Sequence, residues 1–425
     1  MSADLSSRIR QGLTDVCDEA GAPADGTVAP FTRPAPAVRT RRVWLAPLAA
    51  AMGVAAVLAA MVLVPHGTGG DVAPVPGSPH HAPAIARTLP GAKAFAGRVD
   101  DSPPGPASMV VDYINPVYED LHSQVLAVAS DGHTYREVPD AGMRSILAPD
   151  GNKVVSGDDG RLKLIDLRTG DTTNFEPGGS GTVTPSSYSP DGRHVLYQLA
   201  SNHYNACPCS TVLLDLRTGH RKVLSSHGGR GAAFSPDSTR IATESGDDIA
   251  VMDLTGRELD RFPAHGGRLY SGHAWSPDGT LLALSFDDTR LPWSQRQNAW
   301  YGIRFLDLAT GKLLPAKISF HDNFPDPVLG WTDPRHVVIG DLDRVVVQDL
   351  DGHIQRVITD PVGGTVDDMA AGLLPKLVTV DSGTPDYGPW PTWLDRLVIG
   401  SVTMVVLLVF LLVRVVLRRR RRRSG

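Results

Sequence analysis

"SPDGRHVLYQLA" (Ser189–Ala200), followed by "LLDLRTGHRKVL" (Leu213–Leu224), decides the fold of this 425-residue chain. In the first stretch, Pro presets φ for a tight turn, Asp caps the turn with its own side chain, and Gly accepts a positive φ. A β-rich run follows that turn. In the second stretch, an apolar strand ends at Asp215, turns at Gly219 and continues into another strand. The two stretches together predict short strands joined by tight turns.

Both motifs recur along the chain at intervals of roughly 40–55 residues. Four short strands in each period are typical of a propeller blade. We therefore expect an all-β fold, a six-bladed β-propeller over residues 107–383. The first turn recurs at residues 148–151, 189–192, 235–238, 276–279 and, in degenerate form, 332–335, and the second motif carries Asp166, Asp215, Asp253, Asp307 and Asp349.

Five blades are plain in the sequence, and the sixth can be assembled from both ends of the repeat region. Residues 123–138 are expected to form its third and fourth strands, and residues 366–383 its first and second. Joining both ends in one blade closes the ring and removes exposed strand edges. The stretch "SMVVDYI" (Ser108–Ile114) is left over, so a seven-bladed ring is the alternative.

The pair of motifs S-P-D-G and D-L-x-T-G resembles the WD-like repeats of bacterial TolB-type propellers and of the propellers in prolyl oligopeptidases. The Asp of the second motif stands where WD repeats keep theirs, but Ile, Leu, Met or Gln replaces the Trp. The resemblance covers about 270 residues. It implies a fold and hardly any function, because one fold hosts many functions.

Two uncharged apolar runs flank the repeats. Residues 43–64 are 22 residues long, enough to span a hydrocarbon core of about 30 Å as a helix. The second run, residues 397–413, is followed by Arg414 and then by six arginines, residues 418–423, and Arg39, Arg41 and Arg42 precede the first run. Positive flanks mark the cytoplasmic side of a membrane. We predict two transmembrane α-helices, with both termini in the cytoplasm and the propeller outside.

These two runs make the lipid bilayer an expected partner. The Ala-, Gly-, Arg- and Pro-rich composition is typical of a bacterial protein, so we expect the plasma membrane as the location. The runs also determine the predicted order of segments. We expect a cytoplasmic segment with a short helix (1–42), a first transmembrane helix (43–64), a Pro/Gly/Ala-rich linker (65–106), the propeller (107–383), a juxtamembrane linker (384–395), a second transmembrane helix (396–417) and a cytoplasmic Arg tail (418–425).

Charge argues against nucleic acid as a partner. The formal net charge is −5, but residues 43–413 hold 28 basic and 41 acidic residues. An acidic body repels phosphates, so we predict no nucleic-acid binding. Three cysteines cannot form a disulfide framework. Whether Cys207 and Cys209 pair with each other is left open.

The blade geometry sorts the connections onto two faces of the ring. The regular turns share one face, and the irregular insertions share the other, including residues 201–210 and 287–301. Variable loops on a rigid scaffold usually carry binding. Aromatic and Arg side chains there suit an interface, although packing of a long loop onto its own blade is an equal alternative. The candidate binding residues in these two insertions are Tyr204, Trp293, Arg296, Trp300 and Tyr301.

The same face carries "HGGR" twice, at His227–Arg230 and His265–Arg268. Glycine N–H groups and an Arg fork can hold an anion, so His227, Arg230, His265 and Arg268 are weaker candidates. Acidic pairs such as Asp158/Asp159 and Asp247/Asp248 fit hairpin turns better than a calcium site. We predict no metal site and no cofactor.

No catalytic motif is present: the chain lacks a G-x-S-x-G elbow, an H-E-x-x-H pair, a P-loop and a dinucleotide fingerprint. The hydrolase domain of prolyl oligopeptidases has no counterpart either. We expect a membrane-anchored binding or interaction module, a scaffold or sensor, that is not an enzyme and contacts a protein or a small extracytoplasmic ligand. The alternatives are a lactonase- or phytase-like hydrolase using the central channel, and a signalling protein relaying through residues 1–42.

Overall fold

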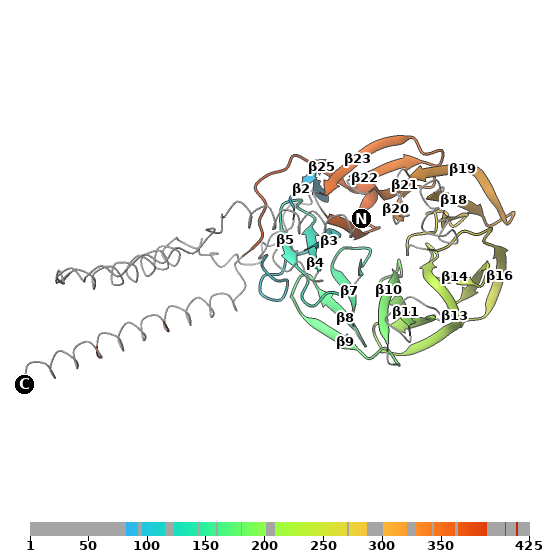
Figure 1. Cartoon of the computed structure of the whole chain (residues 1–425), viewed down its shortest axis with the longest axis horizontal. Coiled ribbons are helices and arrows are strands. Elements are labelled where there is room, and N and C mark those ends of the chain that lie inside the picture. The colour runs from blue at the N-terminus through green and yellow to red at the C-terminus, as the bar shows by residue number, and fades with distance from the viewer. Residues whose placement is uncertain are drawn as a thin grey trace, which may run out of the picture. The chain divides into compact units, whose positions relative to one another are not determined.

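The computed structural model is an all-β ring of six blades (Figure 1). It describes residues 82–91, 96–114, 123–142, 144–158, 160–179, 181–200, 209–269, 272–286, 301–320, 328–341, 344–361 and 364–388, together with the single residues Met404 and Arg414. Within these residues, no helix is long and apolar enough to cross a bilayer. The predicted helices 43–64 and 396–417 lie outside the described residues, apart from Met404 and Arg414.

Each blade is an antiparallel sheet whose strands run outward from the centre in chain order, except in blade 1. Blade 2 contains β6 (Ser145–Leu147), β7 (Lys153–Asp158), β8 (Arg161–Asp166) and β9 (Thr172–Phe175). Blade 3 contains β10 (Thr182–Tyr188), β11 (His194–Ala200), β12 (Cys209–Asp215) and the first half of β13 (Arg221–Phe234). Blade 4 contains the second half of β13, β14 (Arg240–Ser245), β15 (Asp248–Asp253) and β16 (Glu258–Pro263).

Blades 5 and 6 complete the repeated part. Blade 5 has β17 (Leu281–Phe286), β18 (Tyr301–Asp307) and β19 (Lys312–Phe320), and isolated bridges at Arg268 and Trp275 place an inner segment against β17. Blade 6 has β20 (Val328–Asp333), β21 (His336–Asp341), β22 (Arg344–Asp349) and β23 (Ile354–Pro361). The outermost strands β9, β16, β19 and β23 follow the rim in Figure 1.

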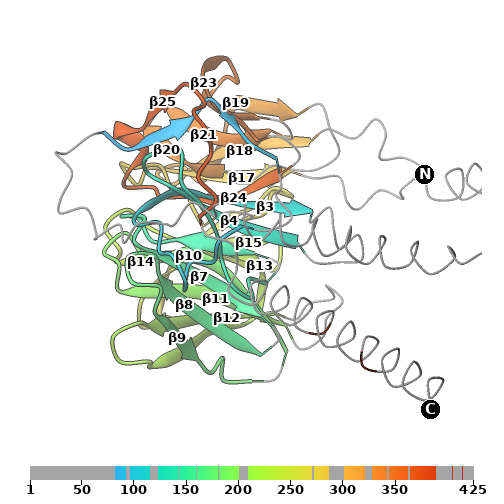
Figure 2. The same ribbon diagram turned by 90° about the vertical axis from the view of Figure 1, so that its left-hand side faces the viewer.

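Blade 1 closes the ring, but with a pairing that differs from the expected one. Its order is β24 (Gly364–Met369), β3 (Ala107–Ile114), β4 (Ser123–Ala129) and β5 (Tyr135–Glu137), and β24 lies beside β3 in Figure 2. The C-terminal end therefore supplies one strand and the N-terminal end three. The predicted division into two and two was wrong, because the stretch assigned as left over is the second strand.

The apolar core confirms six blades and removes the seven-bladed alternative. Because side chains alternate between the two faces of a strand, each sheet packs against both neighbours. The buried apolar residues of the described chain form six clusters, one at each junction between adjacent blades. The cluster between blades 6 and 1 includes Val338 and Val345 from one and Val111 and Leu126 from the other, so the ring is closed.

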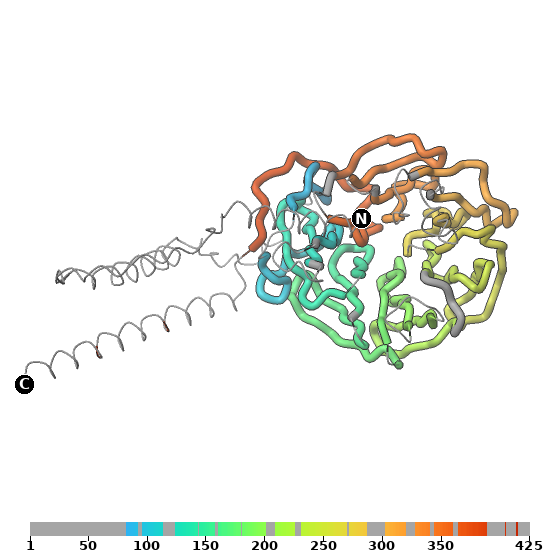
Figure 3. The backbone as a smooth tube through the Cα atoms, in the orientation of Figure 1, coloured from blue at the N-terminus to red at the C-terminus, as the bar shows by residue number. Residues whose placement is uncertain are grey.

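Two straps from the chain ends cover blades 1 and 6 (Figure 3). The N-terminal strap, within residues 82–106, contains β1 (Ala84–Ala86) and β2 (Thr88–Leu89); the C-terminal strap, residues 377–388, contains β25 (Val378–Val380). The strand β1 pairs with β25, and β2 pairs with the outer strand β23. Residues 84–89 were expected to be linker. They form strands instead, and Ile85 and Leu89 are fully buried.

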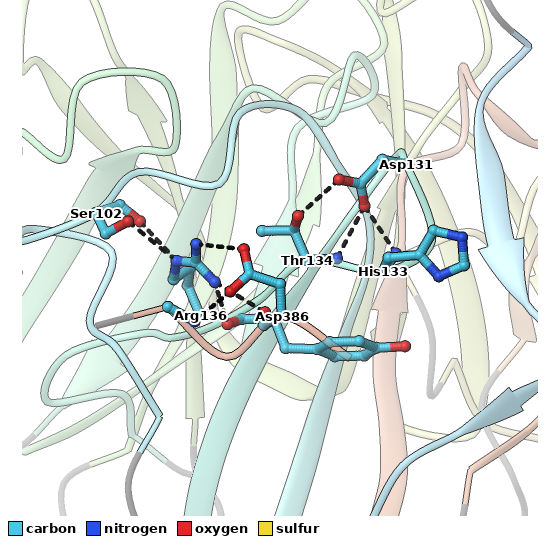
Figure 4. Close-up of polar contacts among 8 residues, drawn as sticks. Ser102, Asp131, His133, Thr134, Arg136 and Asp386 are labelled. Carbon is cyan, nitrogen blue, oxygen red and sulfur yellow. Dashed lines mark hydrogen bonds and ion pairs between the residues drawn. The ribbon is translucent and has the colours of Figure 1, made fainter. Parts of the chain in front are cut away.

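Arg136 fastens both straps to blade 1 (Figure 4). Its side chain is 7% exposed and donates hydrogen bonds to the main-chain oxygens of Ser102, Tyr135 and Asp386 at 2.9–3.0 Å. Its Nη2 also lies 3.0 Å from the carboxylate of Asp386. The guanidinium thus links the N-terminal strap, the outer strand β5 and the C-terminal strap. Its five N–H donors in a planar fork suit such a junction.

Candidate functional site

The turn face carries the two repeated turn motifs. The polar side chains of these motifs form hydrogen bonds within their own turns. Ser189 Oγ donates to Asp191 Oδ1 at 2.6 Å and accepts the N–H of His194 at 2.8 Å. Gly192 takes φ 72°, as predicted for this turn. Ser238 replaces that Gly in blade 4 and still takes φ 59°. These turns recur with the same bonds in blades 4 and 5.

The carboxylates of the second motif are also used within their own turns. Asp215 Oδ1 accepts the N–H groups of Arg217 and Thr218 at 2.9 and 2.8 Å. The hydrogen bond from the Thr218 backbone lowers the pKa of Asp215, and a hydrogen bond from the Thr255 hydroxyl lowers that of Asp253 to about 2. These side chains are therefore ionised turn caps. Their geometry explains the repeat motif without a ligand.

The centre of the ring has a different chemistry. In a propeller the innermost strand of each blade lines the central channel. The innermost strand of blade 1, β24, carries Asp367 and Asp368 side by side, at a bulge in its pairing with β3. Opposite β24, the neighbouring strand carries Asp112, and Arg144 directly precedes β6 of blade 2. Ionisable groups from two blades thus meet at the channel.

Asp368 joins three blades. It is 4% exposed, its Oδ2 accepts the N–H of Leu147 from blade 2 at 2.7 Å, and its Oδ1 lies 2.7 Å from Nε2 of His273 in blade 5. Blade 6 separates blades 1 and 5 along the ring, so this contact crosses the channel. The carboxyl group of Asp368 therefore connects blades 1, 2 and 5.

Further polar contacts extend this arrangement to every blade. The Ser186 hydroxyl of blade 3 donates to the Ala232 oxygen of blade 4 at 2.9 Å, and Ser187 donates to Gly272 of blade 5 at 3.0 Å. Trp331 of blade 6 donates its indole N–H to the His273 oxygen at 2.9 Å. We call these contacts, with those of Asp368, the channel belt. The belt ties all six blades together, and most of its contacts come from the turn-face ends of the innermost strands.

A side chain at position 272 would not fit in this belt. A Cβ on Gly272 would lie 2.2 Å from the Ser186 oxygen, a separation that real Cβ atoms do not show. Blades 3 and 5 therefore approach at backbone distance across the channel. Glycine is required here for close approach, not for its φ angle.

Asp367 lies one residue nearer the opposite face, the loop face, than Asp368. Its Oδ2 accepts the Ser145 N–H at 3.3 Å. Burial raises the pKa of Asp367 to about 8, with a further rise from Asp112 and Asp368, against the lowering effect of Arg144. A raised pKa caused by burial and neighbouring carboxylates is common at functional sites. The Asp367 region is the chemically distinctive part of the channel.

The structure tests few of the predicted site residues. Four of them lie outside the described residues: Tyr204, Trp293, Arg296 and Trp300. Only the backbone is described for Tyr301, at the start of β18, and for His227 and Arg230, within β13. His265, with φ 52°, is exposed at the loop face, and Arg268 is half-buried with its backbone paired to Ser285.

Metal and thiol chemistry receive no support from the described part of the chain. There, no group of three or more His, Cys, Asp or Glu side chains is arranged to hold a metal ion. Asp248 of one predicted acidic pair lies 3.4 Å from Arg261 on the next strand, as a turn-flanking residue. Cys209 is buried at the start of β12, and Cys207 falls outside the described residues, so their pairing stays open.

The sequence reasoning missed Asp367, Asp368 and His273. A usable signal was present: "DD" at residues 367–368 falls inside a predicted first strand, whereas the other acidic pairs fall between strands. Two adjacent carboxylates within an innermost strand point to opposite faces of the sheet, toward the two neighbouring blades, where an acidic side chain needs a polar partner. His273 carried no such signal, because only the ring geometry brings it to Asp368.

Comparison with known proteins adds the following findings. No family model and no curated protein matches the sequence. Two similar solved structures are a Kuenenia stuttgartiensis hydrazine synthase (18% identity, TM-score 0.42, covering 59% of this chain and 78% of that chain) and a putative TolB from Agrobacterium tumefaciens (19% identity, TM-score 0.42, covering 63% and 92%). The second is of the TolB type that the repeat motifs resemble. The likeness concerns the fold alone.

Proposed function

We propose that this propeller is an extracytoplasmic binding module, anchored in the plasma membrane by residues 43–64 and 396–417, that takes its partner at the loop face. The observation that carries the proposal is the difference between the two ends of the channel. The belt around Asp368 links blades across the channel toward its turn-face end, and the turn-face carboxylates are used in their own turns. Asp367 and Arg144 lie on the loop-face side of the belt, so a ligand would reach them from that face.

The insertion of residues 287–301 supports the same choice of face. It leaves β17 at Phe286 and returns at Tyr301, on the loop face, and contains Trp293, Arg296 and Trp300. A repeat array needs only short turns for its own stability. Two tryptophans flanking an arginine have the composition of an interface centre. We assign partner contact to this insertion.

Trp293→Ala and Trp300→Ala are each expected to weaken partner binding by about 1–3 kcal/mol, because truncating a central aromatic removes much of the contact energy. The tagged full-length chain, captured from membranes, provides the partner, and titration measures its affinity. Arg217→Ala, at an exposed residue of the turn face, is the matched control and should leave affinity unchanged. A lowered melting temperature with unchanged affinity would mean that the insertion only packs on its blade.

The membrane topology has its own test. Cys placed at Asp381, whose side chain is 98% exposed, is expected to react with a membrane-impermeant maleimide on intact cells. Cys placed at Ser424 is expected to react only after the cells are permeabilised, because the positive flanks put both termini inside. The unsubstituted chain measures the background from the three native cysteines. The reverse labelling pattern would overturn the anchored arrangement.

A further inference from the structure

The two straps pair with each other over a continuous stretch of chain, in which β1 runs parallel to β25. At one end of this stretch, the Val378 N–H donates to the Pro83 oxygen at 2.9 Å. At the other end, the Ser382 hydroxyl accepts the Thr88 N–H and donates to the Thr88 oxygen, both at 3.0 Å. The paired stretch thus begins at Pro83 and Val378 and ends at Thr88 and Ser382.

The parallel direction decides how a pull on the chain acts on this pair. Tension between the two chain ends enters the N-terminal strap ahead of Pro83 and the C-terminal strap after Ser382. Because the strands are parallel, these two points lie at opposite ends of the paired stretch. The straps must then slide lengthwise past each other. Hydrogen bonds are evenly spaced along a parallel pair, so sliding strains all of them together, whereas peeling from one end breaks them one after another.

Each strap is also held lengthwise against the ring. The strand β2 pairs in parallel with β23, with Thr88 opposite Asp360. In the C-terminal strap, Asp386 forms a parallel bridge to Thr134, and its main-chain oxygen accepts the Tyr135 N–H at 2.8 Å. The outer strands of blades 6 and 1 therefore resist the same sliding motion, one for each strap.

Burial adds to this resistance. Ile85 and Leu89 are fully buried in the apolar cluster between blades 6 and 1. Thr359 of blade 6 donates its hydroxyl to the Ala86 oxygen at 2.6 Å, and Ser108 of blade 1 donates to the Ala84 oxygen at 3.0 Å. Sliding of the N-terminal strap would break these bonds and expose apolar side chains to water at the same time, and both changes cost free energy.

We propose that the two straps form a shear clamp: tension between the ends of the chain is resisted by parallel strand pairs that must break together, before it reaches the blades. The clamp does not depend on the proposed binding function, because it needs only tension between the segments ahead of residue 82 and after residue 388. The two membrane anchors proposed for residues 43–64 and 396–417 are one source of such tension.

Single-molecule force spectroscopy of the full-length chain in detergent tests the effect of direction. Handles attach to cysteines introduced at exposed positions, in a chain whose three native cysteines are replaced by serine. Ala82→Cys with Thr384→Cys pulls at opposite ends of the paired stretch, and Ala82→Cys with Lys376→Cys pulls at the same end. At one loading rate, the first unfolding event of the opposite-end pair is expected to need a severalfold higher force. Equal forces in the two geometries would overturn the proposal.

A further variant distinguishes the clamp from a contact that only stabilises the fold. Ser382→Ala removes both bonds to Thr88 at the far end of the pair. It should lower the opposite-end force, because every bond is strained at once there, and leave the same-end force unchanged, because peeling starts at Pro83 and Val378. Arg217→Ala, at an exposed residue of the turn face, is the control and should change neither force. An equal loss of force in both geometries, or no loss in either, would contradict the clamp.

Discussion

Asp368→Ala is expected to lower the free energy of unfolding by about 2–4 kcal/mol, because a buried N–H loses its acceptor and the missing side chain leaves a void. Asp368 is 4% exposed and accepts short bonds from Leu147 and His273. Its loss removes the acceptor of the Leu147 N–H and the contact with His273 Nε2, and opens a void in the channel belt. Chemical denaturation of the full-length chain in detergent measures the change.

Two variants give this result its meaning. Asp368→Asn keeps the shape and one acceptor, so its effect should be smaller, about 1–2 kcal/mol. Asp381→Ala removes a carboxylate whose side chain is 98% exposed, and should stay within about 0.5 kcal/mol. If Asp368→Ala were as mild as Asp381→Ala, the belt would contribute little to holding the blades together.

The repeated blades were predictable because their signals are local. A turn such as Ser189–Gly192 needs Pro, Asp and a positive φ within four residues, and the structure realises each of these requirements there. The strand order within a blade then determines on which face of the ring each connection lies. Most of the fold could therefore be predicted from local turn motifs.

The closure of blade 1 was not predictable in the same way. Both "SMVVDYI" (Ser108–Ile114) and the stretch around Val378–Val380 have β-forming residues, and alternation does not say which strand pairs with which. The structure pairs Val111 with Val366 and gives Val378 to Ala84. Pairings between the two ends of the chain depend on how the complete ring packs, which local patterns do not encode.

The channel site has the same character. His273 meets Asp368 only because blades 1 and 5 face each other across a closed ring. The irregular insertions directed the sequence-based prediction to the loop face, whereas Asp367 and Asp368 lie in a strand of the propeller itself. The "DD" pair at residues 367–368 indicates buried carboxylates, which need polar partners, but the partner His273 comes from a distant blade.

Arg136→Ala is expected to lower the free energy of unfolding by about 2–4 kcal/mol, because one buried and several partly buried hydrogen-bond acceptors lose a charged donor together. The side chain is 7% exposed and bonds to Ser102, Tyr135 and Asp386 (Figure 4). The two straps should lose stability before the blades do, since both are fastened by this one guanidinium. Hydrogen exchange should therefore rise at Tyr135 and Asp386, whose amides bond within this junction, before it rises at β10 or β14.

Arg98→Ala is the matched control, because Arg98 lies in the N-terminal strap but its side chain forms only a local, half-exposed pair with Asp100 at 3.1 Å. Exposed pairs contribute about 0–1 kcal/mol, so this variant should unfold like the parent chain. Arg136→Lys keeps the charge but loses the fork, and should fall between the two. Uniform exchange throughout the ring in Arg136→Ala would mean that the straps and blades unfold as one unit. Faster exchange confined to the straps would instead show that the ring holds without them, its closure carried by the strands β24 and β3.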